Sequence, residues 1–482
     1  MSPPTRGLTR RAFLSRAAVF GLAVPSAAAL LEACAALASR SPSPAPGSPG
    51  PSPTASGGSS GLPKIVPTPT TATYGGMTYV DGLVCRSCPQ GVLTDRVGEI
   101  ADEAKIPLGP PGGKQSRMAV LDVSVGAADL PAQGYRLEVG PGAQSSGSAA
   151  VLVAVRAADE AGAFYGLLSL GQLLTTDGSA HRVRAASVSD SPGFRRRGVI
   201  LDTPQPPTEA DRVTQLERVR FGVGYKMNFL SLPNATPDHS QPAAGLLEYC
   251  RAHFVEVLSM IGYQDWLTDG PRTLVTDYIR RQYQLGIRSF SFNWDDIHVR
   301  DPERLAAAHA AVLADLYAYV RGLDPEISLF VTLPPYGGVP NVNLLADEKG
   351  IGERYLAAMR ERIPPGVEVF WTGDGGVFSD EVTADAARAY GAAVGHGVAL
   401  WDNNALWSGR HRLPVAGRAA NLPSVIDTYM GNMAGEDAWP GDNGQFALRS
   451  ALEYTWNPPA YARPARLTPS PSALPMPPAP TP

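Results

Sequence analysis

The chain has 482 residues, which at roughly 150 residues per domain is enough for two or three domains, each able to bury a hydrophobic core. Its formal net charge is −4 and it has no long run of Lys or Arg, which argues against nucleic acid as a partner. Gly 50 and Pro 46 together indicate disordered segments attached to a folded body. Four cysteines are too few for a disulfide-built scaffold or a Cys-rich metal cluster.

Residues 1–34 are predicted to direct export. Residues 9–14 (Thr-Arg-Arg-Ala-Phe-Leu) precede an apolar run at 17–31, which is too short for a mature membrane span and is typical of a signal peptide. This segment resembles a twin-arginine export signal, which implies a bacterial protein that works outside the cytoplasm. Residues 31–34 (Leu-Glu-Ala-Cys) resemble a lipobox, with Glu32 as an unusual occupant. The resemblance implies that Cys34 is lipidated and anchors the protein to a membrane.

Residues 35–61 form a Pro/Ser/Gly linker. They show no apolar periodicity and mix stiff Pro with flexible Gly and Ser, as expected for a spacer that holds a domain away from a surface. A spacer favours the lipid-anchored form. Cleavage of the signal and release as a secreted protein is the alternative.

Residues 62–195 are predicted to form a small α+β domain. Strand patterns occur at 117–125, 134–139 and 149–155, followed by a helical pattern at 160–174. Cys85 and Cys88 form a C-x-x-C pair here. A short-range disulfide or two reduced thiols are both favoured over a metal site, because no second Cys or His pair lies nearby in the sequence.

Residues 196–462 show eight short apolar strand patterns that alternate with helical ones. This number of β and α units in about 250 residues predicts a (β/α)8 barrel, giving an α/β fold preceded by a small α+β domain. The predicted strands are 199–203, 227–232, 254–261, 289–294, 328–333, 367–372, 397–401 and 425–430, and the helices include 208–221, 274–285, 302–323, 352–363 and 384–395. Residues 463–482 read as a Pro-rich tail.

The strand ends are where a barrel of this kind carries its chemistry. Acidic, amide and aromatic residues dominate there, with no cysteine nucleophile, no H-E-x-x-H, no phosphate-binding loop and only a solitary His298. Such residues suit a sugar, because aromatic faces stack on its C–H surface while amides and carboxylates bind its hydroxyls. The strongest candidates for catalysis are Asp295 and Asp296, since two carboxyl groups can cleave an acetal. Adjacent residues serve one site only if the strand ends and the backbone turns there.

Several segments around these strand ends resemble glycoside hydrolase family 84, the β-N-acetylglucosaminidases that include O-GlcNAcases and bacterial hyaluronidase-like enzymes. They are residues 285–297 around Asp295 and Asp296, Trp371-Thr372-Gly373, Trp401-Asp402-Asn403, Asn432-Met433 with Glu436 downstream, and residues 453–458 (Glu-Tyr-Thr-Trp-Asn-Pro). Residues 157–166, 170–174 and 190–198 are similar to the domain that precedes the barrel in families 84 and 20. The resemblance covers roughly residues 62–461, in matching order.

The resemblance implies substrate-assisted catalysis with retention, in which the 2-acetamido oxygen of the substrate attacks the anomeric carbon and forms an oxazoline. Asp295 would accept the acetamido N–H in its charged form. Asp296 would carry the proton given to the glycosidic oxygen. The remaining implied ligands of the sugar are Tyr336, which would bind the acetamido oxygen, Asn403 and Asn432, which would bind polar groups, and Trp371 and Trp401, which would line the N-acetyl pocket. No metal or organic cofactor is implied.

The chain also departs from the family pattern. Residues 201–205 read Leu-Asp-Thr-Pro-Gln where the family has Glu-Gly-Phe-Tyr-Gly, a lysine is replaced around Asn234, and Ser408 stands where an aspartate is expected. Several ligands of the sugar hydroxyls are therefore missing. We expect either that Asp202 or Asp402 compensates or that the enzyme prefers another N-acetylhexosaminide, such as a galacto-configured one.

Three functions are compatible with these observations. The first is an exported, lipid-anchored exo-β-N-acetylhexosaminidase acting on N-acetylhexosamine-containing glycans outside the cell. The second is a family 20-like hexosaminidase, which the Asp-Asp pair disfavours because that family uses Asp-Glu. The third is a catalytically impaired barrel retained as a surface glycan-binding lipoprotein.

Overall fold

The structure is a computed structural model, and one compact unit, residues 61–482, contains all the residues it describes. The described residues are 62–109, 117–141, 150–201, 208–235, 244–262, 267–297, 299–337, 350–403, 415–433 and 442–462. Cys34 and the predicted signal, linker and tail lie outside this part of the chain. None of the helices that the structure describes is long and apolar enough to span a bilayer.

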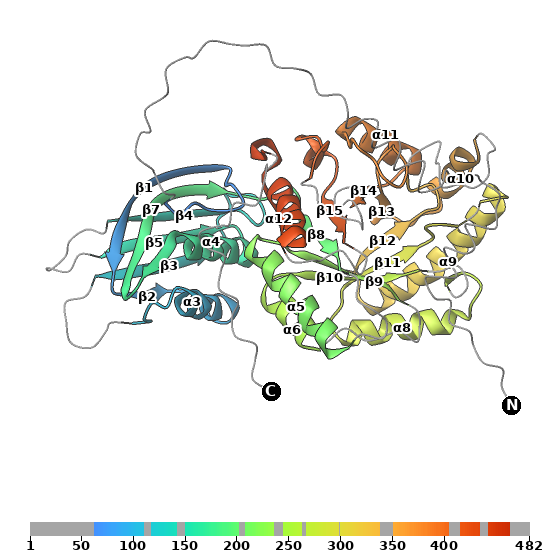
Figure 1. The fold of residues 1–482 in the computed structure, drawn as a ribbon. Coiled ribbons are helices and arrows are strands. Elements are labelled where there is room, and N and C mark those ends of the chain that lie inside the picture. The colour runs from blue at the N-terminus through green and yellow to red at the C-terminus, as the bar shows by residue number, and fades with distance from the viewer. Residues whose placement is uncertain are drawn as a thin grey trace, which may run out of the picture. The chain divides into compact units, whose positions relative to one another are not determined.

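The small domain is a mixed sheet in the order β1-β7-β4-β5-β3-β2, with β6 paired to β7 (Figure 1). Its strands alternate between buried and exposed residues, most regularly in β5, which places one face of the sheet against α4, and α3 packs on α4. Its elements are β1 (Thr71–Val80), β2 (Gly82–Ser87), α3 (Val92–Glu103), β3 (Met118–Val125), β4 (Tyr135–Pro141), β5 (Val151–Ala157), α4 (Glu160–Leu173), β6 (Leu174–Asp177) and β7 (Ala180–Asp190). The predicted small α+β domain is confirmed.

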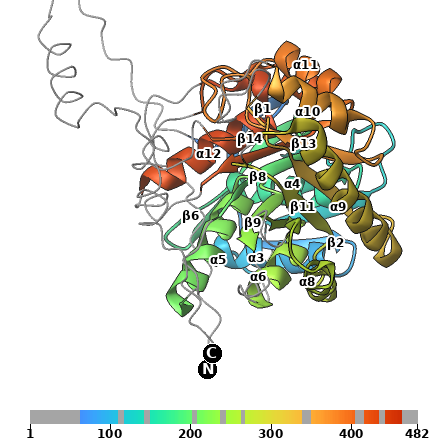
Figure 2. The same cartoon turned by 90° about the vertical axis from the view of Figure 1, so that its right-hand side faces the viewer.

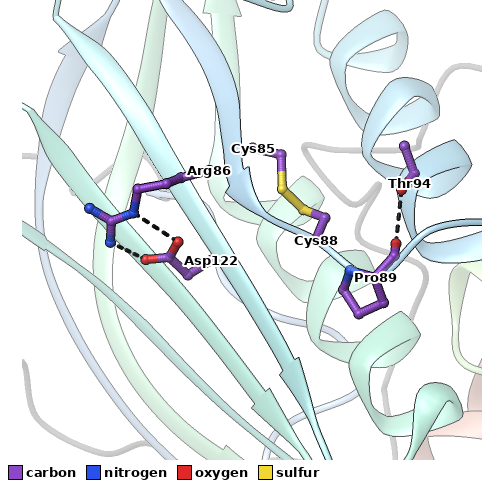
Figure 3. Close-up of a disulfide and its surroundings, with 6 residues drawn as sticks. All are labelled: Cys85, Arg86, Cys88, Pro89, Thr94 and Asp122. Carbon is purple, nitrogen blue, oxygen red and sulfur yellow. Dashed lines mark hydrogen bonds and ion pairs between the residues drawn. A yellow bond between two sulfur atoms is a disulfide. The ribbon is translucent and has the colours of Figure 1, made fainter.

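The C-x-x-C pair of the small domain forms a disulfide. Cys85 lies in β2 and Cys88 follows that strand, with their Cα atoms 6.1 Å apart (Figure 3). The side chains of Arg86 and Asp122 pair beside it, on neighbouring strands. Of the two alternatives that the sequence left open, the structure has the disulfide.

The second region is a closed barrel of eight parallel strands, in the order β10-β11-β12-β13-β14-β15-β8-β9, with helices around its outside (Figures 1 and 2). The predicted (β/α)8 fold is confirmed. The strands are β8 (Arg196–Ile200), β9 (Phe229–Ala235), β10 (Glu256–Ile261), β11 (Ser289–Asn293), β12 (Ser328–Thr332), β13 (Val367–Trp371), β14 (Val398–Asp402) and β15 (Thr428–Asn432). The helices are α5 (Glu209–Gly224), α6 (Ala244–Ala252), α8 (Arg272–Gln284), α9 (Pro302–Leu323), α10 (Ile351–Arg360), α11 (Ala384–Val394) and α12 (Asp442–Trp456), with short 3-10 helices η1 (Leu422–Ser424) and η2 (Pro458–Ala460).

The amino-terminal end of the barrel is closed by a buried arginine. Arg196 donates to Glu256 at 2.7 Å and to Glu368 at 3.0 Å, so that one guanidinium joins three strands. Gly198 in the same strand allows β8 and β9 to approach, because a Cβ atom there would lie 1.5 Å from the carbonyl oxygen of Phe229. The base of the barrel is therefore occupied, and open space is left at the carboxyl ends of the strands.

The barrel and the small domain share a buried polar cluster around Asp190, the last residue of β7. Its carboxylate accepts hydrogen bonds from Tyr135 at 2.8 Å and from the indole N–H of Trp456 in α12 at 2.9 Å. The ammonium group of Lys226, just beyond α5, lies 3.2 Å from the carboxylate and 4.1 Å from the centre of the Trp456 ring. These contacts join α12 and the residues between α5 and β9 to the small domain.

Candidate active site

A cavity of about 110 Å³ lies at the carboxyl ends of the barrel strands. Its walls combine carboxyl, hydroxyl, amide and indole groups, the kinds of group that bind sugars. The lining residues are Asp295, Asp296, Thr332, Tyr336, Thr372, Val377, Trp401, Asn403 and Asn432. The structure thus brings six of the sequence-predicted site residues together: Asp295, Asp296, Tyr336, Trp401, Asn403 and Asn432.

Strand alternation explains why several of these residues meet. Phe330, Phe370, Trp401 and Met430 belong to the buried cluster inside the barrel, from four consecutive strands. Residues two positions further along a strand point the same way. Thr332, Thr372 and Asn432 occupy those positions after Phe330, Phe370 and Met430, and Asn403 does so after Trp401.

The two adjacent carboxyls face one cavity because the backbone turns directly after β11. Asp296 has φ of 58°, a left-handed conformation that is strained for most residues and tolerated by Asp. The hydroxyl of Tyr336 donates to Oδ1 of Asp296 at 2.7 Å and holds it in this turn. The expectation that the strand ends and the backbone turns at this pair agrees with the structure.

The two carboxyls differ in environment. Burial, together with the neighbouring charge of Asp296, raises the pKa of Asp295 to about 7. The group that burial favours in its protonated form is thus Asp295, whereas the sequence analysis assigned the retained proton to Asp296. The physical reason is position, because Asp295 is the less exposed of the two side chains. Burial and the charge of Asp296 also raise the pKa of Tyr336, which keeps its hydroxyl a donor.

The residue before the pair is fixed from outside the barrel. Trp294 stacks on His309 of α9 with ring centres 4.4 Å apart, and its indole N–H donates to Thr268 at 2.9 Å. Burial lowers the pKa of His309 to about 3, so the imidazole is neutral. A neutral ring packs against the indole without placing a second charge behind Asp295.

One wall of the cavity is a chain of amides. The side-chain nitrogen of Asn432 donates to the side-chain oxygen of Asn403 at 2.8 Å, and the side-chain nitrogen of Asn403 donates to the carbonyl of Val377 at 3.0 Å. The loop after β13 is therefore joined to the ends of β14 and β15. Val377 was not predicted from the sequence, because an apolar loop residue carries no chemical signal.

Two threonines that were not predicted as site residues, Thr332 and Thr372, also line the cavity. Thr332 donates to the side-chain oxygen of Asn293 at 2.9 Å. Thr372 donates from its hydroxyl to the carbonyl of Gly376 at 2.7 Å, and from its backbone N–H to the carbonyl of Tyr336 at 2.9 Å. Both occupy inward positions of their strands, which a correct assignment of strand phase would have identified.

Two predicted ligands do not lie on the wall of the cavity. Trp371 is fully buried and stacks on Tyr390 of α11, with ring centres 5.8 Å apart. Asp402 is fully buried and pairs with Arg418. Each follows an inward-pointing aromatic residue, Phe370 or Trp401, so alternation directs it toward the helices. Neither side chain is therefore among the residues that line the cavity.

Asp202, His298, Ser408 and Glu436 lie outside the described residues, as does Cys34. Within the described ranges, no group of three or more His, Cys, Asp or Glu side chains could hold a metal ion.

Comparison with known families separates the chain into the same two regions. Residues 265–471 match the family described as beta-N-acetylglucosaminidase, and residues 62–191 match glycosyl hydrolase family 20, domain 2. Protein O-GlcNAcase from Mus musculus is 30% identical over 129 residues, which are 25% of this chain and 13% of the mouse protein. The chain therefore matches only a small part of that relative.

Solved structures share the fold at low sequence identity. CpGH84B has a TM-score of 0.65 at 19% identity, covering 83% of this chain and 72% of its own. The GH20 exo-beta-N-acetylglucosaminidase from Vibrio harveyi, in complex with N-acetylglucosamine, has a TM-score of 0.55 at 11% identity, covering 82% and 73%. The match over residues 265–471 and the mouse relative identify a β-N-acetylglucosaminidase-like glycoside hydrolase, and residues 62–191 form a domain of the kind found in glycosyl hydrolase family 20.

Proposed function

We propose that the protein is a retaining exo-β-N-acetylhexosaminidase, with N-acetylglucosaminides as its substrates, that works by the substrate-assisted oxazoline mechanism. The observation that carries the proposal is the convergence of Asp295 and Asp296 on one cavity, with Asp296 hydrogen-bonded to Tyr336. Two similar proteins support the substrate class: one is an O-GlcNAcase, and the other is an exo-β-N-acetylglucosaminidase with N-acetylglucosamine bound.

The first step breaks the glycosidic bond. The acetamido oxygen of the substrate attacks the anomeric carbon, while Asp296 gives its proton to the departing glycosidic oxygen. Asp295 accepts the acetamido N–H and stabilises the positive charge that develops on the oxazoline. In the second step, Asp296 takes a proton from water, whose oxygen bonds to the anomeric carbon on the face from which the leaving group departed. The bond between that carbon and the acetamido oxygen breaks, which opens the oxazoline ring. One water is consumed, and the configuration is retained.

This mechanism requires Asp295 to be ionised when substrate is bound. Burial works against that form in the unliganded cavity. The acetamido N–H and the growing positive charge of the oxazoline favour the carboxylate, so the binding energy of Asp295 is realised mainly in the transition state. Trp401, Asn403 and Asn432 would contact the sugar ring and its polar groups. When substrate binds, the hydroxyl of Tyr336 would turn from Asp296 and donate to the acetamido oxygen.

The proposed place of action is the outside of the cell, with Cys34 as a lipid anchor. The Cys85–Cys88 disulfide supports export, because disulfides persist in oxidising compartments. Metabolic labelling with a fatty-acid analogue tests the anchor. We expect label and membrane association in the wild type and neither in Cys34→Ala. Equal membrane association of both proteins would contradict lipidation at Cys34.

Turnover of aryl N-acetyl-β-glucosaminides tests the activity. Asp296→Ala should lose much more kcat/KM on a substrate with a poor leaving group than on an activated phenol, since protonation matters less for the latter. Asp295→Ala should lose activity on both alike. Galacto-configured and polymeric substrates, with a thiazoline inhibitor, test sugar preference and exo action. An inert wild type that still binds N-acetylglucosamine polymers would instead support a surface glycan-binding lipoprotein.

A further inference from the structure

A buried ion pair lies directly behind the amide wall of the cavity. Arg418 donates from Nε to Oδ2 of Asp402 at 2.8 Å and from Nη2 to Oδ1 at 2.5 Å, in a two-pronged arrangement. The side chains are 2% and 0% exposed. The hydroxyl of Tyr429 in β15 also donates to Asp402 at 2.8 Å. The charge of Asp402 raises the pKa of Arg418 against the effect of burial, so the guanidinium remains charged.

The same guanidinium holds the segment that follows β13. Its Nη1 donates to the carbonyls of Asp380 at 3.0 Å and Ala416 at 2.7 Å. The backbone N–H of Val382 donates to the carbonyl of Gly417 at 2.8 Å. Gly417 has φ of 69°, and a Cβ atom there would lie 2.0 Å from the carbonyl oxygen of Asp380. The segment carrying Arg418 is thus fitted against residues 380–382 at close range.

These anchor points are next to the residues that form the cavity wall. Asn403 directly follows Asp402, and Val377 precedes Asp380 by three positions. Asn403 donates to the carbonyl of Val377 at 3.0 Å. Arg418 therefore fixes both partners of this hydrogen bond from behind, one through the carboxylate of Asp402 and the other through the backbone of Asp380.

We propose that Arg418 is a positioning residue of the active site, which acts through Asp402 to set the amide of Asn403 against the sugar. The inference rests on the proposed function, because it assigns Asn403 to the substrate. Arg418 itself does not line the cavity. Lysine cannot replace it, because a single ammonium cannot hold both oxygens of Asp402 and two separate carbonyls in one plane.

The test combines Arg418→Lys with Asn403→Ala in a double-mutant cycle. We expect Arg418→Lys to lower kcat/KM about tenfold, because a small displacement of a group that binds the substrate lowers the rate. The loss should be equal for good and poor leaving groups, because proton transfer by Asp296 is untouched. The double variant should be no worse than Asn403→Ala alone, since the arginine acts through that amide. Tyr429→Phe, which removes one hydrogen bond to Asp402, should show a smaller loss of the same kind.

Arg196→Lys is the matched control, a buried two-carboxylate arginine at the opposite end of the barrel. It should lower Tm while leaving the kcat/KM of the folded enzyme within about twofold of wild type. Losses that multiply in the double variant, or an Arg418→Lys enzyme with wild-type kcat/KM, would overturn the inference.

A wild type without turnover would refute the proposed function but not yet this inference. The same variants are then compared by their Kd for N-acetylglucosamine, measured by calorimetry. We expect the double variant to bind no more weakly than Asn403→Ala alone. Additive losses of affinity, or no binding by the wild type, would overturn it.

Discussion

The hydroxyl of Tyr336 lies 2.7 Å from Oδ1 of Asp296, although the two residues follow different strands of the barrel. The contact spans 40 positions of the sequence and secures the residue with the left-handed backbone. The geometry of the carboxyl pair is therefore determined by the neighbouring strand as well as by its own.

Removing this contact tests its contribution. Tyr336→Phe should lower kcat/KM roughly 10- to 100-fold, because a hydrogen bond to a charged group contributes about 1.5–3 kcal/mol. Steady-state kinetics on an aryl N-acetyl-β-glucosaminide measure the loss, with the Tm as a check on folding. Unchanged kinetics would show that Asp296 needs no support from the tyrosine.

The ionisation of Asp295 predicts the acidic side of the pH profile. Since the carboxylate form accepts the acetamido N–H and its pKa is about 7, kcat/KM should rise with pH through about 7. Asp295→Asn should retain little activity, and the activity that remains should not rise with pH near 7. If kcat/KM of the variant still rises near pH 7, another group is responsible for this pH dependence.

The same shift predicts how stability depends on pH. The folded protein holds the Asp295 proton up to about pH 7, whereas the ordinary value of an Asp is 3.8. The wild type should therefore lose stability as the pH rises across this window. Asp295→Asn avoids the loss, so its Tm advantage should be larger at pH 8 than at pH 5. An advantage that does not change with pH would contradict the shift.

The close approach of β8 and β9 predicts an intolerant glycine. Gly198→Ala should destabilise the barrel by about 3 kcal/mol or more, because its Cβ would overlap the carbonyl of Phe229. Gly98→Ala in α3 is the control: nothing lies within 4 Å of its Cβ, and alanine should stabilise that helix by roughly 0.5–1 kcal/mol. Urea unfolding distinguishes the two signs, and equal effects would refute the explanation.

The buried cluster at Asp190 predicts that removing the charge of Lys226 alone will greatly lower the free energy of unfolding. Lys226→Met leaves the Asp190 carboxylate buried without its cation, which should cost about 3–5 kcal/mol. Asp190→Asn combined with Lys226→Met should recover part of this energy in urea unfolding. A single-variant loss below about 1 kcal/mol, as for exposed pairs, would be inconsistent with this burial.

Much of the fold could be predicted from the sequence, because apolar barrel strands alternate with helical patterns. The helix predicted at residues 302–323 has those bounds in the structure. The first barrel strand was placed too late, since it begins with Arg196, whose charge is paired inside the barrel base. β1 and β7 were not predicted, because their partly exposed residues carry little apolar signal.

The sequence indicated which kinds of side chain form the site, but not which strand residues point into the barrel. Barrel strands are buried on both faces, so their composition does not show which residues point inward. The family resemblance implied Trp371, and the missing hydroxyl ligands suggested Asp402, but neither lines the cavity, whereas the inward-pointing Thr332 and Thr372 do. The left-handed turn at Asp296 also leaves no mark in the sequence, since an aspartate occupies it rather than a glycine.

Asn457 donates from its side-chain nitrogen to the carbonyls of Thr68 at 3.1 Å and Pro69 at 3.0 Å, joining positions 389 and 388 residues apart. A truncated protein that ends before residue 457, or begins after residue 70, would lack these hydrogen bonds. The two regions should therefore be produced as one polypeptide. The same proximity makes the protein suited to circular permutation, with these segments linked and new termini opened in an exposed loop.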